Sequence, residues 1–479
     1  MVLSLQSTRT ALLVLIVHLM LAAPARVASA QAGDVPAAAS ESMQGAHLTV
    51  DAAIAGILRQ VSAEQIQQTI KKLAGFGTRY TLSVNSPSAA SSDQGIVAAR
   101  TWIKAEFERY SADCGGCLEV KTDTFVQQPK SRIPQPTELQ NVYAILKGTD
   151  PVQAKRIYLV TGHYDSVNRQ AVNLTDPAPG ANDDASGTAV SLECARVLSK
   201  LRFPATIIFL TVSGEEQGLD GSSHFAKMAK EQGWQLEGVL NNDIVGGNRT
   251  PGDTMRKPDW VRVFSEGVPA AATEADLRRI RSAGSENDSS SRQLARYIRE
   301  VASTYDFSPF TPQLIFRRDR YLRGGDHSAF NEQGFAAVRF TEYREDFHHQ
   351  HENPRTENGI EFGDLIKFVD FDYVANVARL NAATLAALAS SPAPPPKARL
   401  LTRELENNSK IQWEAAAGAG GYEVLWRLTT DPWFSEENVI QTKETKVDLP
   451  ESKDNVIFGV RSVDAQGHRS LIVIPEPER

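Results

Sequence analysis

The sequence predicts an α/β protein: a three-layer α/β/α sandwich with a mostly parallel mixed sheet, followed by a small all-β sandwich. Over 92–245, helical segments alternate with short apolar runs, which is typical of strands joined by covering helices. Beyond a Pro-rich stretch at 390–398, the pattern changes to short alternating strands separated by turn residues. The 479 residues give room for both parts, because the chain is about twice as long as common single domains.

The α/β part extends from residue 46 to residue 389. Residues 246–325 are polar and interrupted by Pro, Ser and Asp, with one amphipathic helix marked by Leu294 and Ile298. We expect this region to be an insertion that shapes a substrate pocket. The other helices are expected up to about residue 75 and at 92–110, 186–201 and 363–388, and the strands at 118–126, 140–147, 156–162, 206–213, 238–245 and 335–341.

The C-terminal part is predicted to be a separate domain at 399–479. Residues 390–398 are rich in Pro and Ser and read as a semi-rigid linker. The strand patterns around Trp413 and Tyr422 resemble a fibronectin type III module. Such a module could bind a protein or polymer partner, shield the active part or aid secretion, and the sequence leaves these roles open.

The N-terminus carries a targeting pattern. Arg9 precedes an apolar run at 11–23, and Ala28-Ser29-Ala30 is a small-residue cleavage site, so residues 1–30 are predicted to be a signal peptide. The apolar run is shorter than the ~20 residues of a spanning helix, which argues against an uncleaved anchor. We expect a secreted or periplasmic protein without a membrane span in the mature chain. The Ala/Ser/Gly-rich stretch 31–45 is expected to be disordered.

The net charge bears on possible ligands, and the three cysteines bear on disulfide bonding and metal binding. The formal net charge is −7 and Lys and Arg form no stripe, which argues against nucleic acid as a ligand. Cys114 and Cys117 flank two glycines, and in an exported protein they could close a small disulfide loop. These two cysteines could also be half of a zinc site, but this interpretation is weaker, because the sequence has no second cysteine pair to complete four ligands. Cys194 lies on an apolar helical stripe and is expected to be a buried thiol.

Polar residues that suit a metal site follow two of the predicted strands. His163 comes directly after the strand at 156–162, and Asp165 lies two positions on, where it could orient the imidazole. Glu215 and Glu216 follow the strand at 206–213. Successive side chains of an extended chain point in opposite directions, so one carboxylate can bind a metal while its neighbour moves a proton. Because the pair follows the 163–165 motif and the acidic segment 180–187 in the chain, the order of these motifs predicts a two-metal hydrolase site.

Three further segments complete the donor set. Asp183 lies in the Gly-flanked segment 180–187, which ends by starting a helix, and its two oxygens could bridge two cations. Asp243 ends an apolar strand, where a buried carboxylate needs a partner or a cation. The segment 347–351 contains three histidines, and imidazole together with carboxylate oxygen suits zinc.

The order of these motifs resembles the co-catalytic zinc aminopeptidases, a superfamily that includes bacterial leucyl aminopeptidases, carboxypeptidase Q-like enzymes and the transferrin receptor. The resemblance covers roughly residues 50–390. It implies that the domain at 46–389 is a zinc exopeptidase that binds two Zn²⁺ per chain and acts on peptide substrates. It rests on His-x-Asp at 163–165, Gly-x-x-Asp-x-x-Ser-Gly at 180–187, Glu-Glu at 215–216, Asn-x-Asp at 241–243 and Phe-His at 347–348.

The resemblance also implies a role for each site residue. His163 and Asp243 bind one zinc, Glu216 and a late histidine bind the other, and Asp183 bridges them, with a cis peptide bond expected at Asp183–Asp184. For the late histidine we choose His349, with His351 and His348 as alternatives. A zinc-bound water attacks the peptide bond, Glu215 is the general base, and Asp165 orients His163.

Several functions remain compatible with the sequence. An aminopeptidase is the first expectation, and a carboxypeptidase or dipeptidase of the same fold is the next, because Arg317, Arg318, Arg320 and Arg323 could bind a terminal carboxylate. A glutaminyl cyclase-like acyltransferase would use one zinc. A non-catalytic binding protein is the last alternative.

Overall fold

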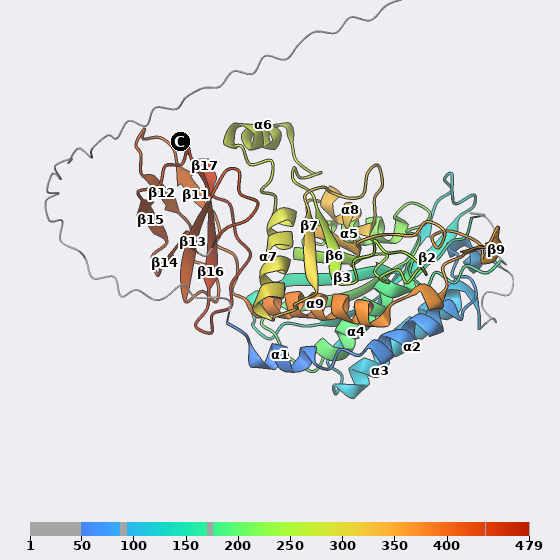
Figure 1. Cartoon of the computed structure of the whole chain (residues 1–479). Coiled ribbons are helices and arrows are strands. Elements are labelled where there is room, and N and C mark those ends of the chain that lie inside the picture. Colours follow the sequence, from blue (N-terminus) through green and yellow to red (C-terminus); the bar gives the residue numbers. More distant parts are fainter. Residues whose placement is uncertain (1–48, 87–92, 170–175, 436, 479) are drawn as a thin grey trace, which may run out of the picture. The chain divides into compact units, whose positions relative to one another are not determined.

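The computed structural model describes residues 49–86, 93–169, 176–435 and 437–478. An eight-stranded mixed sheet lies at its centre (Figure 1). The strand order is β1-β2-β4-β3-β5-β8-β6-β7. Pairing is parallel from β4 through β3 and β5 to β8, so the carboxyl ends of these four strands lie at one edge. The strands are β1 (Leu118–Gln127), β2 (Thr137–Leu146), β3 (Arg156–His163), β4 (Thr206–Val212), β5 (Gln235–Asn242), β6 (Trp260–Ser265), β7 (Thr311–Ile315) and β8 (Ala337–Glu342).

Helices cover both faces of this sheet. Within β4, Ile207 and Phe209 belong to one apolar core and Ile208 and Leu210 to another, because alternate side chains point to opposite faces. The first core is completed by α1, α2, α3, α4, α7 and α9, and the second by α5 and α8. The three-layer α/β/α sandwich is confirmed. The helices are α1 (Ala52–Leu58), α2 (Ala63–Ala74), α3 (Gly95–Asp113), α4 (Ala185–Leu198), α5 (Asp220–Glu231), α6 (Glu274–Ala283), α7 (Ser290–Thr304), α8 (Asp326–Glu332) and α9 (Phe371–Ser390), with 3₁₀ turns η1 (Thr81–Asn85), η2 (Gln153–Lys155) and η3 (Ile366–Phe368).

The region 246–325 contains more regular structure than its sequence indicated. It supplies two strands of the central sheet, β6 and β7, and the helix α6 in addition to the predicted α7. The strand β7 contains Pro312 and lies at the edge of the sheet, where a missing amide hydrogen is tolerated. Both strands are short and flanked by polar residues, which hid them from a search for apolar runs.

Two small sheets form the C-terminal part, in the orders β15-β12-β11-β17 and β14-β13-β16. Their shared core includes Trp413 and Tyr422, whose rings meet edge to face with centroids 5.3 Å apart. An all-β part after the α/β part is therefore confirmed, whereas its likeness to fibronectin type III and the boundary at 390–398 stay predictions. The strands are β11 (Arg399–Leu401), β12 (Ser409–Gln412), β13 (Gly421–Leu428), β14 (Val439–Thr442), β15 (Lys446–Leu449), β16 (Val456–Val463) and β17 (Glu476–Glu478); β9 (Arg355–Glu357) and β10 (Ile360–Phe362) form a separate hairpin.

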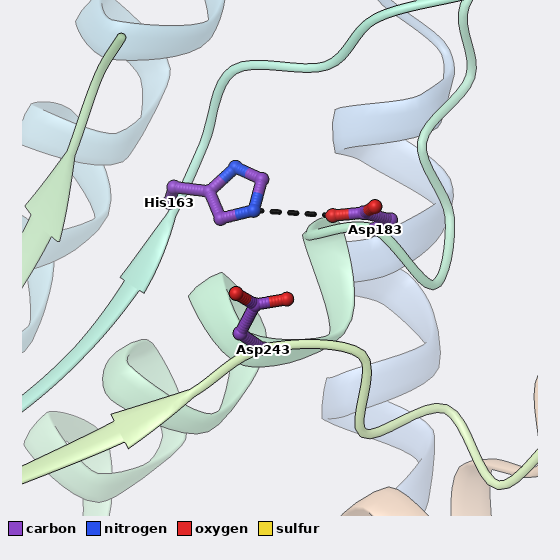
Figure 2. Close-up of side chains that lie close together, drawn as sticks. All are labelled: His163, Asp183 and Asp243. Carbon is purple, nitrogen blue, oxygen red and sulfur yellow. Dashed lines mark ion pairs between the residues drawn. The ribbon is translucent and has the colours of Figure 1, made fainter. Parts of the chain in front are cut away.

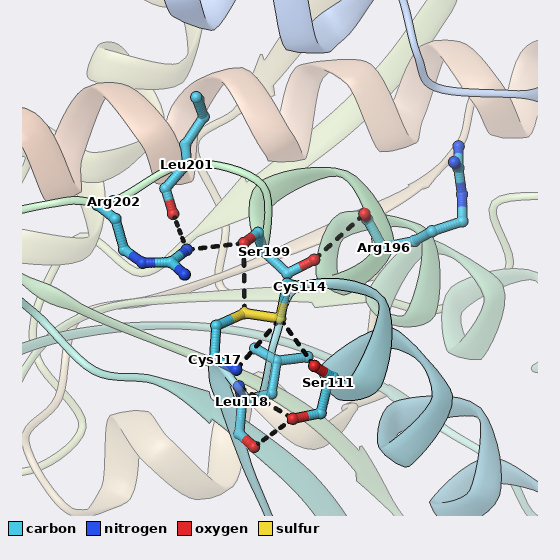
Figure 3. The surroundings of a disulfide bond; sticks show 8 residues. All are labelled: Ser111, Cys114, Cys117, Leu118, Arg196, Ser199, Leu201 and Arg202. Carbon is cyan, nitrogen blue, oxygen red and sulfur yellow. Dashed lines mark hydrogen bonds between the residues drawn. A yellow bond between two sulfur atoms is a disulfide. The ribbon is translucent and has the colours of Figure 1, made fainter.

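Cys114 and Cys117 form a disulfide bond just after α3 (Figure 3). The bonded Sγ of Cys117 lies 3.3 Å from the backbone oxygen of Ser199, so the loop packs against the end of α4. Cys194 is a buried free thiol, as its position on an apolar stripe predicted.

The predicted signal peptide at 1–30 and the predicted disorder at 31–45 lie outside the described residues. Over the described ranges, no helix is both long and apolar enough to cross a bilayer.

Candidate metal centre

His163, Asp183 and Asp243 come together at the carboxyl edge of the parallel strands (Figure 2). His163 ends β3 and Asp243 directly follows β5, its parallel neighbour, so both side chains are delivered to the same edge. Asp183 precedes the N-cap of α4. One ligand atom from each residue lies within 4.8 Å of the others, and Nε2 of His163 is 3.1 Å from Oδ1 of Asp183. This first cluster has the donor types and spacing of a divalent cation site.

A second cluster contains Asp183, Glu216 and His351. Nε2 of His351 lies 2.9 Å from Oδ2 of Asp183 and 3.1 Å from Oε1 of Glu216. Asp183 therefore presents Oδ1 to the first cluster and Oδ2 to the second. The two clusters share one carboxylate, as the resemblance implied for a bridging residue.

Asp165 joins His163 to the Glu215-Glu216 turn. Nδ1 of His163 lies 3.2 Å from the backbone oxygen of Asp165 and 3.5 Å from its Oδ1. The same carboxylate accepts hydrogen bonds from the backbone N–H of Glu215 at 3.3 Å and of Glu216 at 3.2 Å. Asp165 thus has the contacts needed to orient His163, and it also fixes the turn that carries both glutamates.

Two residues without a sequence signal hold the loop around Asp183. Asp364 accepts hydrogen bonds from the backbone N–H of Asn182 at 2.8 Å and of Asp183 at 2.7 Å. Arg79 is fully buried and donates to the backbone oxygens of Tyr164 at 2.6 Å and Gly180 at 2.9 Å. The peptide bond between Asp183 and Asp184 is cis, as the resemblance implied.

The structure places His351, and not the predicted His349, in the second cluster. The ring of His349 stacks on Phe368 with centroids 3.6 Å apart, and its Nδ1 lies 3.2 Å from Oγ1 of Thr250. His348 is half-exposed and contacts Asp346. The choice of His349 is therefore corrected to His351. Spacing alone could not separate histidines of one tight loop, where His351 has a positive φ of 56°.

The clusters concentrate negative charge in a buried space. Burial works to lower the pKa of His163, but Asp184, Asp165 and Asp183 outweigh it and hold this pKa well above its ordinary value. The pKa of His351 is likewise raised, because Glu216 and Asp183 outweigh its burial. Burial also raises the pKa of Glu216 above its ordinary value, and the neighbouring Asp183 adds to this shift.

Glu215 lies beside both clusters without belonging to either of them. It is half-buried and close enough to act on the charge of His163. Burial raises the pKa of Glu215 well above its ordinary value; His163 opposes this shift, and Asp243 and Glu216 add to it. Its role as the free carboxylate of the pair thus agrees with its position.

Histidine and carboxylate clusters at the carboxyl edge of an α/β sheet are typical of one class of protein, the metal-dependent hydrolases. Residues 141–366 match the model of "Peptidase family M28". A "Probable zinc metalloprotease" of Pyrenophora teres f. teres is 45% identical over 433 residues, which cover 89% of this chain and 87% of that protein. The chain belongs to Peptidase family M28, and it is therefore a hydrolase of the metallopeptidase class.

A second curated relative agrees with this membership. A "Probable zinc metalloprotease" of Pyricularia oryzae is 44% identical over 437 residues, covering 89% of this chain and 85% of that protein. Among solved structures, LapA of Legionella pneumophila is similar over 73% of this chain and 80% of its own, with a TM-score of 0.49 and 20% identity.

We expect His351→Ala and His349→Ala to differ in zinc content. The first change removes a donor of the second cluster, so the protein should keep one zinc instead of two after dialysis against a weak chelator. The second removes a ring outside both clusters and should leave zinc content unchanged. Metal analysis of the two purified variants checks this, and the opposite pattern would restore His349 as the ligand.

Proposed function

We propose that the protein is an exported, two-zinc exopeptidase, and that it is an aminopeptidase hydrolysing N-terminal peptide bonds with Glu215 as the general base. The observation that carries this proposal is the pair of clusters that share Asp183, together with Glu215, which precedes the cluster residue Glu216 in the chain and interacts electrostatically with His163 and Asp243. Export rests on the sequence of residues 1–30. Amino-terminal sequencing of the secreted protein should find a start near Gln31.

The donor set fits zinc. His163, Asp183 and Asp243 would hold one ion, and Asp183, Glu216 and His351 the other. Oε1 of Glu216 is buried and accepts no hydrogen bond from the residues that the structure describes, since its 3.1 Å contact with His351 lacks hydrogen-bond geometry. A cation would satisfy this oxygen. Bound zinc would supply a Lewis acid that polarises the scissile carbonyl and acidifies the attacking water.

In this proposal Glu215 moves the proton. Its backbone is fixed by Asp165, and its carboxylate is not needed as a ligand. It can accept a proton from the attacking water and return it to the amine that leaves. Its neighbour Glu216 stays on the metal, so the two adjacent carboxylates divide the two tasks.

The contacts of two of the four candidate arginines favour an aminopeptidase over a carboxypeptidase. Arg320 is nearly buried and pairs with Asp319 and Glu345 at 3.1 and 2.8 Å. Arg318 pairs with Glu332 at 3.0 Å and also donates to the backbone oxygen of Ser328. These side chains are committed to protein partners, so binding a substrate carboxylate would require breaking those pairs.

The surroundings of Asp183 suit a positive group. A small cavity next to Asp183 is also lined by Asp346 and Asp364, and by Glu345, whose charge is already paired with Arg262 and Arg320 at 2.7 and 2.8 Å. The N-terminal amine of a peptide carries a positive charge that such a wall attracts. This supports recognition of the substrate by its free amine.

Chelation and substrate blocking test this proposal together. Treatment with a strong chelator should abolish hydrolysis of an aminoacyl anilide, and added zinc should restore it, because the clusters supply the metal-binding donors. An N-blocked dipeptide should not be cleaved. Preferred cleavage of the blocked dipeptide would favour a carboxypeptidase. One zinc ion per chain together with cyclase activity would favour an acyltransferase. A protein that binds no metal and has no activity would favour a binding role.

A further inference from the structure

Arg339 lies directly against Asp243, one of the residues of the first cluster. It belongs to β8, where it pairs in register with Asn241 of β5. Its Nη2 is 2.8 Å from Oδ1 of Asp243 and 3.4 Å from the backbone oxygen of the same residue. The side chains are 0% and 3% exposed, so neither charge is solvated by water. The buried guanidinium of Arg339 therefore contacts Asp243, a candidate metal ligand, at both a carboxylate oxygen and the backbone oxygen.

Arg339 is itself fixed from its other side. Its Nη1 donates to the backbone oxygen of Gly324 at 2.9 Å and contacts Oδ2 of Asp319 at 3.4 Å. Gly325 leaves the space for this arrangement, because an added Cβ would lie 2.5 Å from Nη1 of Arg339 and 3.2 Å from Oδ2 of Asp243. The planar fork of an arginine can make these contacts at once, whereas a lysine amine acts from one point.

We propose that Arg339 is a positioning residue for the metal centre: it occupies Oδ1 of Asp243 and leaves the other oxygen as the single ligand atom offered to a cation. The carboxylate of Asp243 faces His163 and Asp183 (Figure 2). Fixing its rotation prepares the first cluster for one metal and leaves the second cluster untouched, since Arg339 contacts neither Glu216 nor His351 among its described partners. This inference rests on the proposed two-zinc function.

The test is zinc binding by the full chain after chelator treatment, measured by calorimetry and by metal analysis. The wild-type protein should bind two zinc ions. In Arg339→Met, the affinity for one of the two zinc ions should fall by about 10–100-fold, as is common when the hydrogen-bond partner of a ligand is lost. The affinity for the other zinc ion should not change. Arg339→Lys should restore part of the loss. In an Asp243→Asn background, adding Arg339→Met should weaken zinc binding no further.

Arg156→Met is the matched control. Arg156 is also a buried arginine paired with a carboxylate, Glu237 at 3.0 Å, but it begins β3, at the end opposite to His163. Its loss should lower stability without changing either zinc affinity.

Each outcome decides between two readings. If Arg339→Met binds both zinc ions with wild-type affinity, or loses affinity equally for both, the positioning role is overturned. The proposed function is still upheld in that case, provided that the wild-type protein binds two zinc ions. A wild-type chain that binds no zinc would overturn both. Should Arg339→Met fail to fold, Arg339→Lys carries the same test, with a smaller weakening of one equivalent only.

Discussion

We expect Glu215→Gln to lower kcat/KM for an aminoacyl anilide by about 10²–10⁴-fold, the contribution usual for a general acid–base residue. The amide keeps the size and shape of the side chain but cannot take a proton from water. Because Glu215 belongs to neither metal cluster, the variant should retain two zinc ions. Steady-state kinetics and metal analysis of the same preparation measure both effects.

The adjacent Glu216→Gln is the control for this prediction. Glu216 contributes an oxygen to the second cluster, so its replacement should lower activity through loss of zinc, and high zinc concentration should recover part of the rate. Zinc should not rescue Glu215→Gln. Near-normal turnover in Glu215→Gln would show that another group moves the proton.

The sequence pointed to the candidate metal ligands that follow regular structure. His163, Glu216 and Asp243 come after apolar strands, and parallel strands bring their carboxyl ends to one edge. Asp183 was found from its Gly-flanked loop before a helix. For the late histidine, His349 was chosen and His351 was an alternative, because the choice depended on loop conformation, which carries no periodic signal.

The supporting residues had no local signal at all. Asp364 bonds to the loop at 182–183 from a position about 180 residues away along the chain, and Arg339 meets Asp243 only because β8 pairs with β5. Such contacts are products of the finished fold. Polar residues that support a site from a distance are therefore the part that a single sequence hides.

The same holds for the contact between the C-terminal sheets and the α/β part. Arg427 of β13 donates twice to the carboxylate of Asp288, at 2.7 and 2.8 Å, and Arg296 of α7 lies 2.9 Å from the same carboxylate. Arg461 of β16 pairs with Glu300 of α7 at 2.8 Å. Asp288 and Arg427 are 1% and 2% exposed, so this is a buried ionic contact and not a flexible tether. The all-β part thus contributes charges that the α/β part needs.

Asp288→Asn should therefore lower the free energy of unfolding by about 3–5 kcal/mol, the cost usual when one partner of a buried ion pair is removed. The asparagine keeps the volume of the side chain but leaves the guanidinium groups of Arg296 and Arg427 without their carboxylate. Urea unfolding, followed by tryptophan fluorescence, measures the change.

Two companion variants separate this cause from general damage. Glu414→Gln removes a carboxylate from an exposed pair with Lys397, and such pairs contribute about 0–1 kcal/mol, so its unfolding midpoint should stay near that of the wild type. Adding Arg427→Met to Asp288→Asn removes one uncompensated charge and should recover part of the loss, because an apolar side chain of similar length tolerates burial. The contrary result is that adding Arg427→Met to Asp288→Asn lowers the free energy of unfolding by as much as Arg427→Met does in the wild-type protein. That result would show that the two residues act independently. The C-terminal sheets would then be held to α7 by their apolar and other polar contacts, without a contribution from this pair.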